Sequence, residues 1–123
     1  MARRALILED ENVLRKHLGR LLQRQGFEVC AAASVQSFRD HVACERFDVV
    51  LLDLSLPDGD GIHAWEQARR EQPAARAILM TAHGSADTAR RAAASGIAAV
   101  LAKPLDLRAL LDWVEPAAVT GAA

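Results

Sequence analysis

The sequence has few cysteines, no long apolar run and no recognisable leader, and each shortage excludes a class of protein. Cys30 and Cys44 lie in separate segments without a CxxC spacing, which favours buried free thiols over a disulfide or a metal pair. The apolar run after Arg4 is too short for a signal peptide, and no run reaches membrane-spanning length. We therefore expect a cytoplasmic protein that makes no contact with a membrane.

The charge is almost balanced, at −1 over 123 residues. Because there is no basic excess, we do not expect this segment to bind nucleic acid directly. A composition of 51% hydrophobic and 25% charged residues is typical of a globular chain rather than a disordered one. The length suits one compact domain. We predict that this domain spans residues 1–116 and that residues 117–123 form a small-residue tail or the start of a linker.

Five short runs are apolar on both faces, as buried parallel strands are. They cover residues 5–8, 27–31, 49–52, 77–80 and 97–102. Segments with helical spacing separate them, and the clearest has an apolar stripe made of Val13, Leu14, Leu18, Leu21 and Leu22. Later helices are expected to begin at Ser34, near Gly61, at Ser85 and at Asp106. Strands that alternate with helices predict a doubly wound α/β fold, with helices on both faces of a parallel sheet.

A reactive polar residue follows four of the five predicted strands. They are, in chain order, Glu9 with Asp10, then Asp53, Thr81 and Lys103. In an open parallel sheet the carboxyl ends of the strands lie along one edge, where ligands bind. We therefore expect these residues, which are distant in sequence, to converge at that edge.

Three carboxylates in one place would raise one another's pKa values unless a cation lay among them. Oxygen ligands without a nearby His or Cys favour a hard ion such as Mg2+, with Mn2+ as the alternative. That ion and Lys103 would offset the charges of Glu9, Asp10 and Asp53, so the site could receive an anion. An aspartate is an established nucleophile for phosphoryl transfer, and Asp53 is alone at its strand end. We predict that Asp53 is the acceptor and that Lys103 and Thr81 contact phosphoryl oxygens.

Each residue alone also has an ordinary structural explanation. An aspartate after a buried strand is usually a helix cap or a turn former. Glu9 and Asp10 could serve the positive end of the first helix, and Lys103 could be a solvated charge. It is their combination at one edge of one sheet that favours phosphoryl chemistry.

Four segments resemble the receiver domains of bacterial response regulators. They are Leu-Ile-Leu-Glu-Asp-Glu at 6–11, Leu-Leu-Asp-Leu-Ser-Leu-Pro-Asp-Gly-Asp-Gly at 51–61, Met-Thr-Ala-His-Gly at 80–84 and Leu-Ala-Lys-Pro-Leu at 101–105. The resemblance covers residues 3–115. It implies a flavodoxin-like (βα)5 fold with sheet order 2-1-3-4-5, and a cis bond between Lys103 and Pro104.

The resemblance also implies a role for each site residue. Asp53 would be the phosphoacceptor, and Asp10, Asp53 and the backbone carbonyl of Ser55 would bind Mg2+, with Glu9 helping through water. Lys103 and Thr81 would contact the phosphoryl group. A sensor histidine kinase or a phosphotransfer protein would supply that group, and the domain would switch an output. The implied domain assists its own phosphorylation and dephosphorylation but is not a turnover enzyme.

One position departs from the family pattern. Receivers usually carry Tyr or Phe three residues before the lysine, and this sequence has Val100 there. A β-branched side chain cannot report a rotamer change as a ring does. We therefore expect phosphorylation to be retained and the coupling from Thr81 to the surface to be altered.

Two rival functions remain open. Val100 would suit a receiver-like interaction module with impaired switching. The other rival is a phosphotransferase enzyme with an aspartyl nucleophile. Such enzymes usually carry an Asp-x-Asp motif after their first strand, in which the second aspartate protonates the leaving group. Here Asp53 follows the third strand, and Ser55, two residues later, is a poor general acid.

The resemblance allows further partners. A homodimer through helix four, strand five and helix five is common in the family. The segment at 80–85 resembles receivers attached to DNA-binding outputs, which points to transcription regulation. The histidines are expected to be surface or loop residues rather than ligands, and they are His17, His41, His63 and His83.

Overall fold

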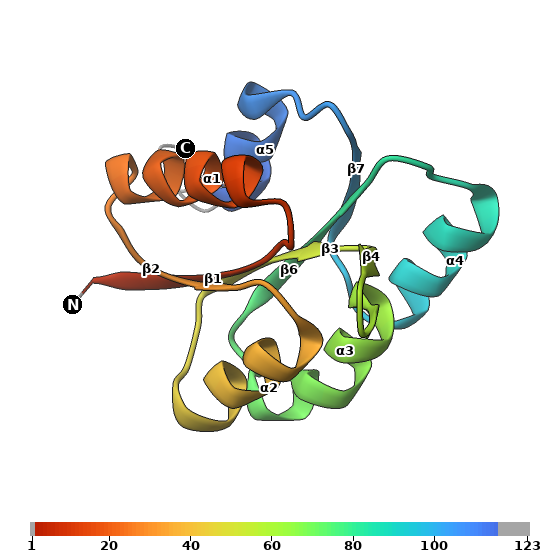
Figure 1. The fold of residues 1–123 in the computed structure, drawn as a ribbon, viewed down its shortest axis with the longest axis horizontal. Helices are drawn as coiled ribbons and strands as arrows, with labels where there is room; N and C mark the ends of the chain where they lie inside the picture. Colours follow the sequence, from red (N-terminus) through yellow and green to blue (C-terminus); the bar gives the residue numbers. More distant parts are fainter. Residues whose placement is uncertain (1, 116–123) are drawn as a thin grey trace, which may run out of the picture.

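Five parallel strands form the central sheet of the computed structural model, which describes residues 2–115 (Figure 1). They are β1 (Arg3–Leu8), β2 (Phe27–Ala32), β3 (Val49–Asp53), β6 (Arg76–Thr81) and β7 (Ala99–Ala102). Their order is β2-β1-β3-β6-β7. Since β4 (Ser55–Leu56) and β5 (Gly59–Asp60) form a separate hairpin, this is the predicted order 2-1-3-4-5 of the long strands. The expected tail at 117–123 lies outside the described residues.

Helices cover both faces of the sheet, as predicted. On one face lie α1 (Asn12–Arg24) and α5 (Leu107–Val114), and on the other α2 (Val35–Cys44), α3 (Gly61–Ala68) and α4 (Ala86–Ala94) (Figure 1). A 3-10 turn, η1 (Arg69–Glu71), continues α3. Within residues 2–115, no helix combines the length and the apolar character needed to span a bilayer.

Side-chain caps stand at the start of all five α-helices within residues 2–115, and Glu11 caps α1 by accepting a hydrogen bond from the Leu14 N–H. The predicted caps Ser34, Ser85 and Asp106 each accept a hydrogen bond from a backbone N–H in the first turn of their helix. Asp60 caps α3 in the same way, which places that start at Gly61 as predicted. Such a cap stabilises a helix by about 1 kcal/mol. The helix starts, and with them the loops at the carboxyl edge, are therefore held by local hydrogen bonds.

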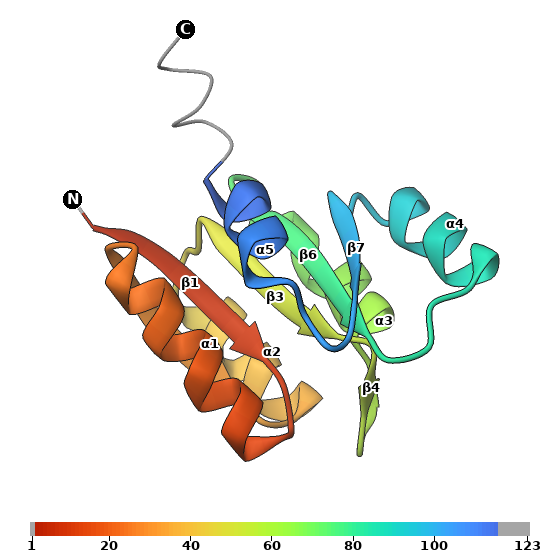
Figure 2. The ribbon, with the colours of Figure 1, turned by 90° about the horizontal axis from the view of Figure 1, so that it is seen from above.

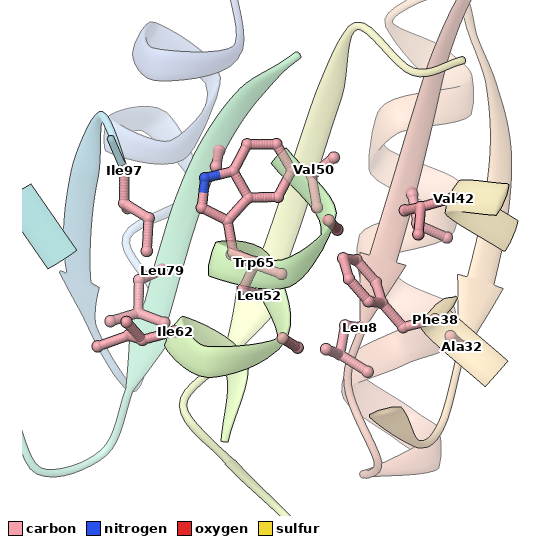
Figure 3. Packing of buried hydrophobic residues seen from close by; sticks show 14 of the residues in the cluster. Leu8, Ala32, Phe38, Val42, Val50, Leu52, Ile62, Trp65, Leu79 and Ile97 are labelled. Atoms are coloured by element: carbon pink, nitrogen blue, oxygen red, sulfur yellow. The ribbon is translucent and has the colours of Figure 1, made fainter. Parts of the chain in front are cut away.

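The strands are apolar on both sides because their side chains alternate between two cores. Leu6 and Leu8 of β1 pack with residues of α2 and α3, whereas Ala5 and Ile7 pack with residues of α1 and α5. Figure 3 shows the first of these cores, where Trp65 of α3 lies over the sheet. Each fully buried Leu or Ile contributes about 1.5–3 kcal/mol. The two helical layers thus account for the predicted apolar runs.

Some details differ from the sequence expectations. Ile97 is buried but precedes β7, because its backbone N–H closes α4 by donating to the Ala92 carbonyl at 3.0 Å. Val13 lies in the first turn of α1 and is 68% exposed, so it does not belong to the apolar stripe. Cys30 and Cys44 are free thiols as expected, but Cys30 is half-buried and Cys44 is exposed at the end of α2.

Candidate functional site

Four of the predicted site residues meet at the carboxyl edge of the sheet. Carboxylate oxygens of Glu9, Asp10 and Asp53 lie within 4.8 Å of one another. Lys103 Nζ is 2.7 Å from Glu9 Oε1 and 3.3 Å from Asp53 Oδ1. Figure 2 shows β1 and β3 pointing the same way, towards the end of the molecule where β4 lies. The expected convergence is therefore present for these four residues.

The three carboxylates differ in their exposure to solvent. Glu9 is fully buried, Asp53 is 6% exposed, and Asp10 is exposed. Glu9 is also held from two sides, because Lys103 contacts Oε1 and the backbone N–H of Glu11 donates to Oε2 at 3.0 Å. The cluster thus has a rigid buried side at Glu9 and an open side at Asp10.

Burial and charge act against each other in this cluster. Burial raises the pKa of Glu9 above its usual 4.5, although hydrogen bonds from Lys103 and from Glu11 oppose the rise. Burial alone would lower the pKa of Lys103, but Glu9 and Asp53 outweigh it and raise that pKa above its usual 10.5. Lys103 therefore stays charged at neutral pH. It offsets one of the three carboxylates and leaves a site that suits a further cation.

Thr81 and Ser55 lie at the same edge but outside this cluster. Thr81 ends β6, is 3% exposed, and its Oγ1 accepts a hydrogen bond from the His83 backbone N–H at 3.1 Å. In the register of β3 and β6, Asp53 pairs with Met80, so Thr81 is one residue beyond it. Ser55 begins β4 and is exposed. Within residues 2–115, neither side chain forms a hydrogen bond with the three carboxylates.

Backbone hydrogen bonds hold the segments that carry the site. The Lys103 N–H donates to the Thr81 carbonyl at 2.9 Å, and the Leu54 N–H donates to the Met80 carbonyl at 3.0 Å. The bond between Lys103 and Pro104 is cis, as the resemblance implied. Residues from β3, β6 and β7 are thereby fixed relative to one another.

The sequence predicts a helix start near Gly61 but does not indicate how closely Gly61 contacts the end of β3. A Cβ at Gly61 would lie 2.1 Å from the backbone oxygen of Asp53 and 3.3 Å from Leu52 Cβ. The Gly61 N–H also donates to the Leu54 carbonyl at 3.0 Å. The start of α3 thus packs directly on the backbone of Asp53. Its place in the motif at 51–61 was the only sequence signal for this role.

Two other aspartates after β3 have structural roles. Asp58 accepts hydrogen bonds from the backbone N–H groups of Val35 and Gln36 at 2.8 and 3.2 Å, and so holds the start of α2. Asp60 caps α3 and pairs with Arg91 of α4 at 3.0 Å. Hydrogen bonds from Val35 and Gln36 hold the pKa of Asp58 below its usual value. The carboxylates of Asp58 and Asp60 thus bind groups of the protein itself and do not belong to the acidic cluster of Glu9, Asp10 and Asp53.

A flavodoxin-like sheet with an acidic cluster and a lysine at its carboxyl edge is typical of signalling domains that accept a phosphoryl group. The chain matches the description "Response regulator receiver domain" over residues 5–115. The protein belongs to this family of response regulator receiver domains.

Three relatives show how far the similarity extends. The chain is 36% identical over 114 residues to the response regulator protein PilR of Pseudomonas aeruginosa, covering 93% of this chain and 26% of that protein. It is 31% identical to the sporulation initiation phosphotransferase F of Bacillus subtilis, covering 94% of this chain and 93% of that protein. A Burkholderia pseudomallei response regulator, solved with a phosphorylated aspartic acid, a calcium ion and citrate, matches with a TM-score of 0.86 at 27% identity. That match covers 92% of this chain and 66% of the other. The chain spans about a quarter of the length of PilR.

Proposed function

We propose that this domain accepts a phosphoryl group on Asp53 in a Mg2+-dependent reaction and thereby switches an output or a partner. The observation that carries the proposal is the convergence of Asp53 with Glu9, Asp10 and Lys103 at the carboxyl edge. The phosphorylated aspartic acid and the calcium ion of the Burkholderia protein support it, because that protein has a similar fold.

The donor set of the cluster fits a hard divalent cation. It offers three carboxylates and contains no sulfur or imidazole ligand. In our proposal Asp10, Asp53 and the backbone carbonyl of Ser55 would hold Mg2+, and Glu9 would help through water. Mn2+ is the alternative ion. When bound, the ion supplies positive charge that offsets the charge of the phosphoryl group.

The side chains of the domain carry out the transfer itself. A carboxylate oxygen of Asp53 forms a bond to phosphorus as the bond between phosphorus and the donor breaks, and the donor leaves with that electron pair. Lys103 is charged and lies 3.3 Å from Asp53 Oδ1, which places it to hold a phosphoryl oxygen. The Thr81 hydroxyl accepts from His83, so its own hydrogen is free to be donated to a second phosphoryl oxygen. The domain is in this view an acceptor rather than a turnover enzyme.

Incubation with a small acyl phosphate and Mg2+ tests the proposal. We expect intact-mass measurement to show one added phosphoryl group on the wild-type protein and none on Asp53→Asn. Chelation of the metal should also prevent the addition. An adduct that persists in Asp53→Asn would place the acceptor elsewhere. Wild-type protein without any adduct would favour the inert interaction module instead, and release of product from a phosphoester substrate would favour the phosphotransferase enzyme.

Mg2+ is expected to raise the thermal unfolding midpoint of the wild-type domain. An ion that binds only the folded state stabilises it by about 2.7 kcal/mol at roughly 100 times its dissociation constant. Asp10→Asn should lose most of this gain because Asp10 is the exposed carboxylate of the cluster. The variant Asp87→Asn, at an exposed position on α4, is the matched control and should keep the full gain. An equal gain in Asp10→Asn and wild type would remove Asp10 from the proposed ion site.

Val100 favours a second candidate function, a receiver-like module with impaired switching. The side chain is half-buried and packs against the core that lies beneath α2 and α3. It pairs with Leu79 in the register of β6 and β7, close to Thr81. In this candidate the domain no longer transfers phosphate and acts by binding a partner alone. Wild-type protein that takes up no phosphoryl group in the experiment above would favour it.

Receiver domains interact with histidine kinases or phosphotransfer proteins. We propose such a protein as the phosphoryl donor and the cytoplasm as the place of reaction. A DNA-binding output on a longer chain is also part of the proposal, because the segment at 80–85 resembles receivers that are attached to such outputs. We also propose a homodimer through α4, β7 and α5, where Arg108 and Asp112 are exposed charges and Arg90 is exposed beside Asp87. Arg91 and Asp106 contribute less to it, since one pairs with Asp60 and the other caps α5.

A further inference from the structure

A second group of metal-binding side chains lies where α2 packs against the edge strand β2. Cys30 belongs to β2, His41 lies in the last turn of α2, and Glu45 follows the end of that helix. One ligand atom from each residue lies within 4.8 Å of the other two. All three side chains are half-buried. None of them belongs to the acidic cluster at Asp53.

The chemistry of this group differs from that of the acidic cluster. A thiol, an imidazole and a carboxylate together favour a borderline ion such as Zn2+ over Mg2+. Three protein ligands with a water molecule in the fourth position make an ordinary tetrahedral site. With bonds of about 2.0–2.3 Å, ligand atoms around one zinc ion lie roughly 3–4 Å apart. Cys30 Sγ and Glu45 Oε2 are already at such a distance, 3.3 Å, and the other pairs lie within 4.8 Å, so they need shifts of at most about 1–2 Å, which small torsion changes supply.

Arg4 is the residue with which an ion must compete. Its guanidinium lies 2.8 Å from Glu45 Oε2 and 3.9 Å from Cys30 Sγ, and the Cys30 thiol donates to the same Glu45 oxygen at 3.3 Å. Arg4 also lies 3.0 Å from Glu28 Oε1, so it keeps a carboxylate partner when it leaves Glu45. Formation of the sulfur–metal bond releases the Cys30 proton to solvent and adds a negative charge beside Arg4. When the ion replaces Arg4 at Glu45, the ion is balanced by Glu45 and the Cys30 thiolate, and Arg4 is balanced by Glu28.

We propose that Cys30, His41 and Glu45 form a binding site for a borderline divalent metal ion of the Zn2+ class. The ion joins β2 to the end of α2 and is independent of the site at Asp53. His41, expected from sequence to be a surface residue rather than a ligand, acquires a role that depends on its distance from Cys30 in the fold.

Co2+ titration of the untagged protein tests this site, with excess Mg2+ present to occupy the acidic cluster. We expect one Co2+ per chain, a thiolate-to-cobalt charge-transfer absorption, and displacement of Co2+ by Zn2+. Cys30→Ser should lose the absorption. His41→Ala and Glu45→Gln should each weaken binding by about tenfold or more, since even residues that only orient a ligand have effects of that size.

Cys44→Ser is the matched control, because Cys44 is the other thiol and lies outside the group. It should keep both the absorption and the affinity, and so should Asp53→Asn. Circular dichroism establishes that each variant is folded, and His41→Ala decides the question if Cys30→Ser does not fold. Absence of the absorption in wild type, its loss in Cys44→Ser, or unchanged affinity in His41→Ala would overturn the proposal.

Discussion

Gly61→Ala is expected to lower the free energy of unfolding by about 3 kcal/mol, the upper end of the usual range for overpacking. The new Cβ, whose position is fixed by the backbone at the start of α3, would lie 2.1 Å from the backbone oxygen of Asp53 at the end of β3. No side chain can rotate to relieve this contact, so the helix or the strand must shift. The thermal midpoint should fall by on the order of 10 °C, measured by circular dichroism.

Gly19→Ala is the control for this prediction. Gly19 lies within α1, and a Cβ there would approach only Val29 Cγ1, at 3.9 Å. Alanine at that position should stabilise the domain by about 0.5–1 kcal/mol, because glycine weakens a helix interior. If Gly61→Ala proved as stable as wild type, the close packing of α3 on the acceptor strand would be wrong.

Lys103→Met is expected to slow phosphorylation of Asp53 by an acyl phosphate by about 100- to 1000-fold, the usual effect of removing one charge-stabilising donor. Lys103 Nζ lies 3.3 Å from Asp53 Oδ1, where developing phosphoryl charge must be held. Mg2+ should bind the same variant more tightly, because a competing positive charge leaves the carboxylates. Rates from intact-mass time courses and Mg2+ titration calorimetry measure the two effects separately.

The same variant should change how stability depends on pH. The pKa of Lys103 is raised in the folded protein by Glu9 and Asp53, which outweigh the opposing effect of burial. A raised lysine pKa contributes stability that is complete below the ordinary value of 10.5 and is lost as the pH rises through the higher folded value. Without Mg2+, wild type and Lys103→Met should therefore converge in stability at strongly alkaline pH.

Lys16→Met is the matched control for both effects. Lys16 lies exposed on α1 and makes no contact with the acidic cluster. Its replacement should leave the phosphorylation rate, Mg2+ affinity and pH profile unchanged. Equal phosphorylation rates in Lys103→Met and wild type would show that Lys103 does not hold the phosphoryl group.

Much of the fold follows from local patterns that tertiary contacts do not override. Ser34, Ser85 and Asp106 cap helices where the sequence predicts them, because each cap needs only its own backbone neighbours. The strands were recognisable as continuous apolar runs, because a strand buried on both faces does not alternate polar and apolar residues. Convergence of Glu9, Asp53 and Lys103 followed from the rule that parallel strands end at one edge.

The remaining features depend on distances that no local pattern contains. The contact of Gly61 with the Asp53 carbonyl arises from the path of the hairpin β4–β5, whose strands have only two residues each. The proximity of Cys30 to His41 depends on how α2 lies against β2. Lys103 was predicted to offset the charge of the carboxylates and to contact the phosphoryl group, but the sequence does not show that it lies nearer to Glu9, at 2.7 Å, than to Asp53.

The β4–β5 hairpin, from Ser55 to Asp60, contacts all three helices on one face of the sheet. Asp58 holds the first turn of α2, and Asp60 both caps α3 and anchors α4 through Arg91. Hydrogen bonds and an ion pair therefore link the chain just beyond Asp53 to three helices. None of these links involves position 100, so the surface formed by α2, α3 and α4 remains connected to the acceptor although the usual ring is absent.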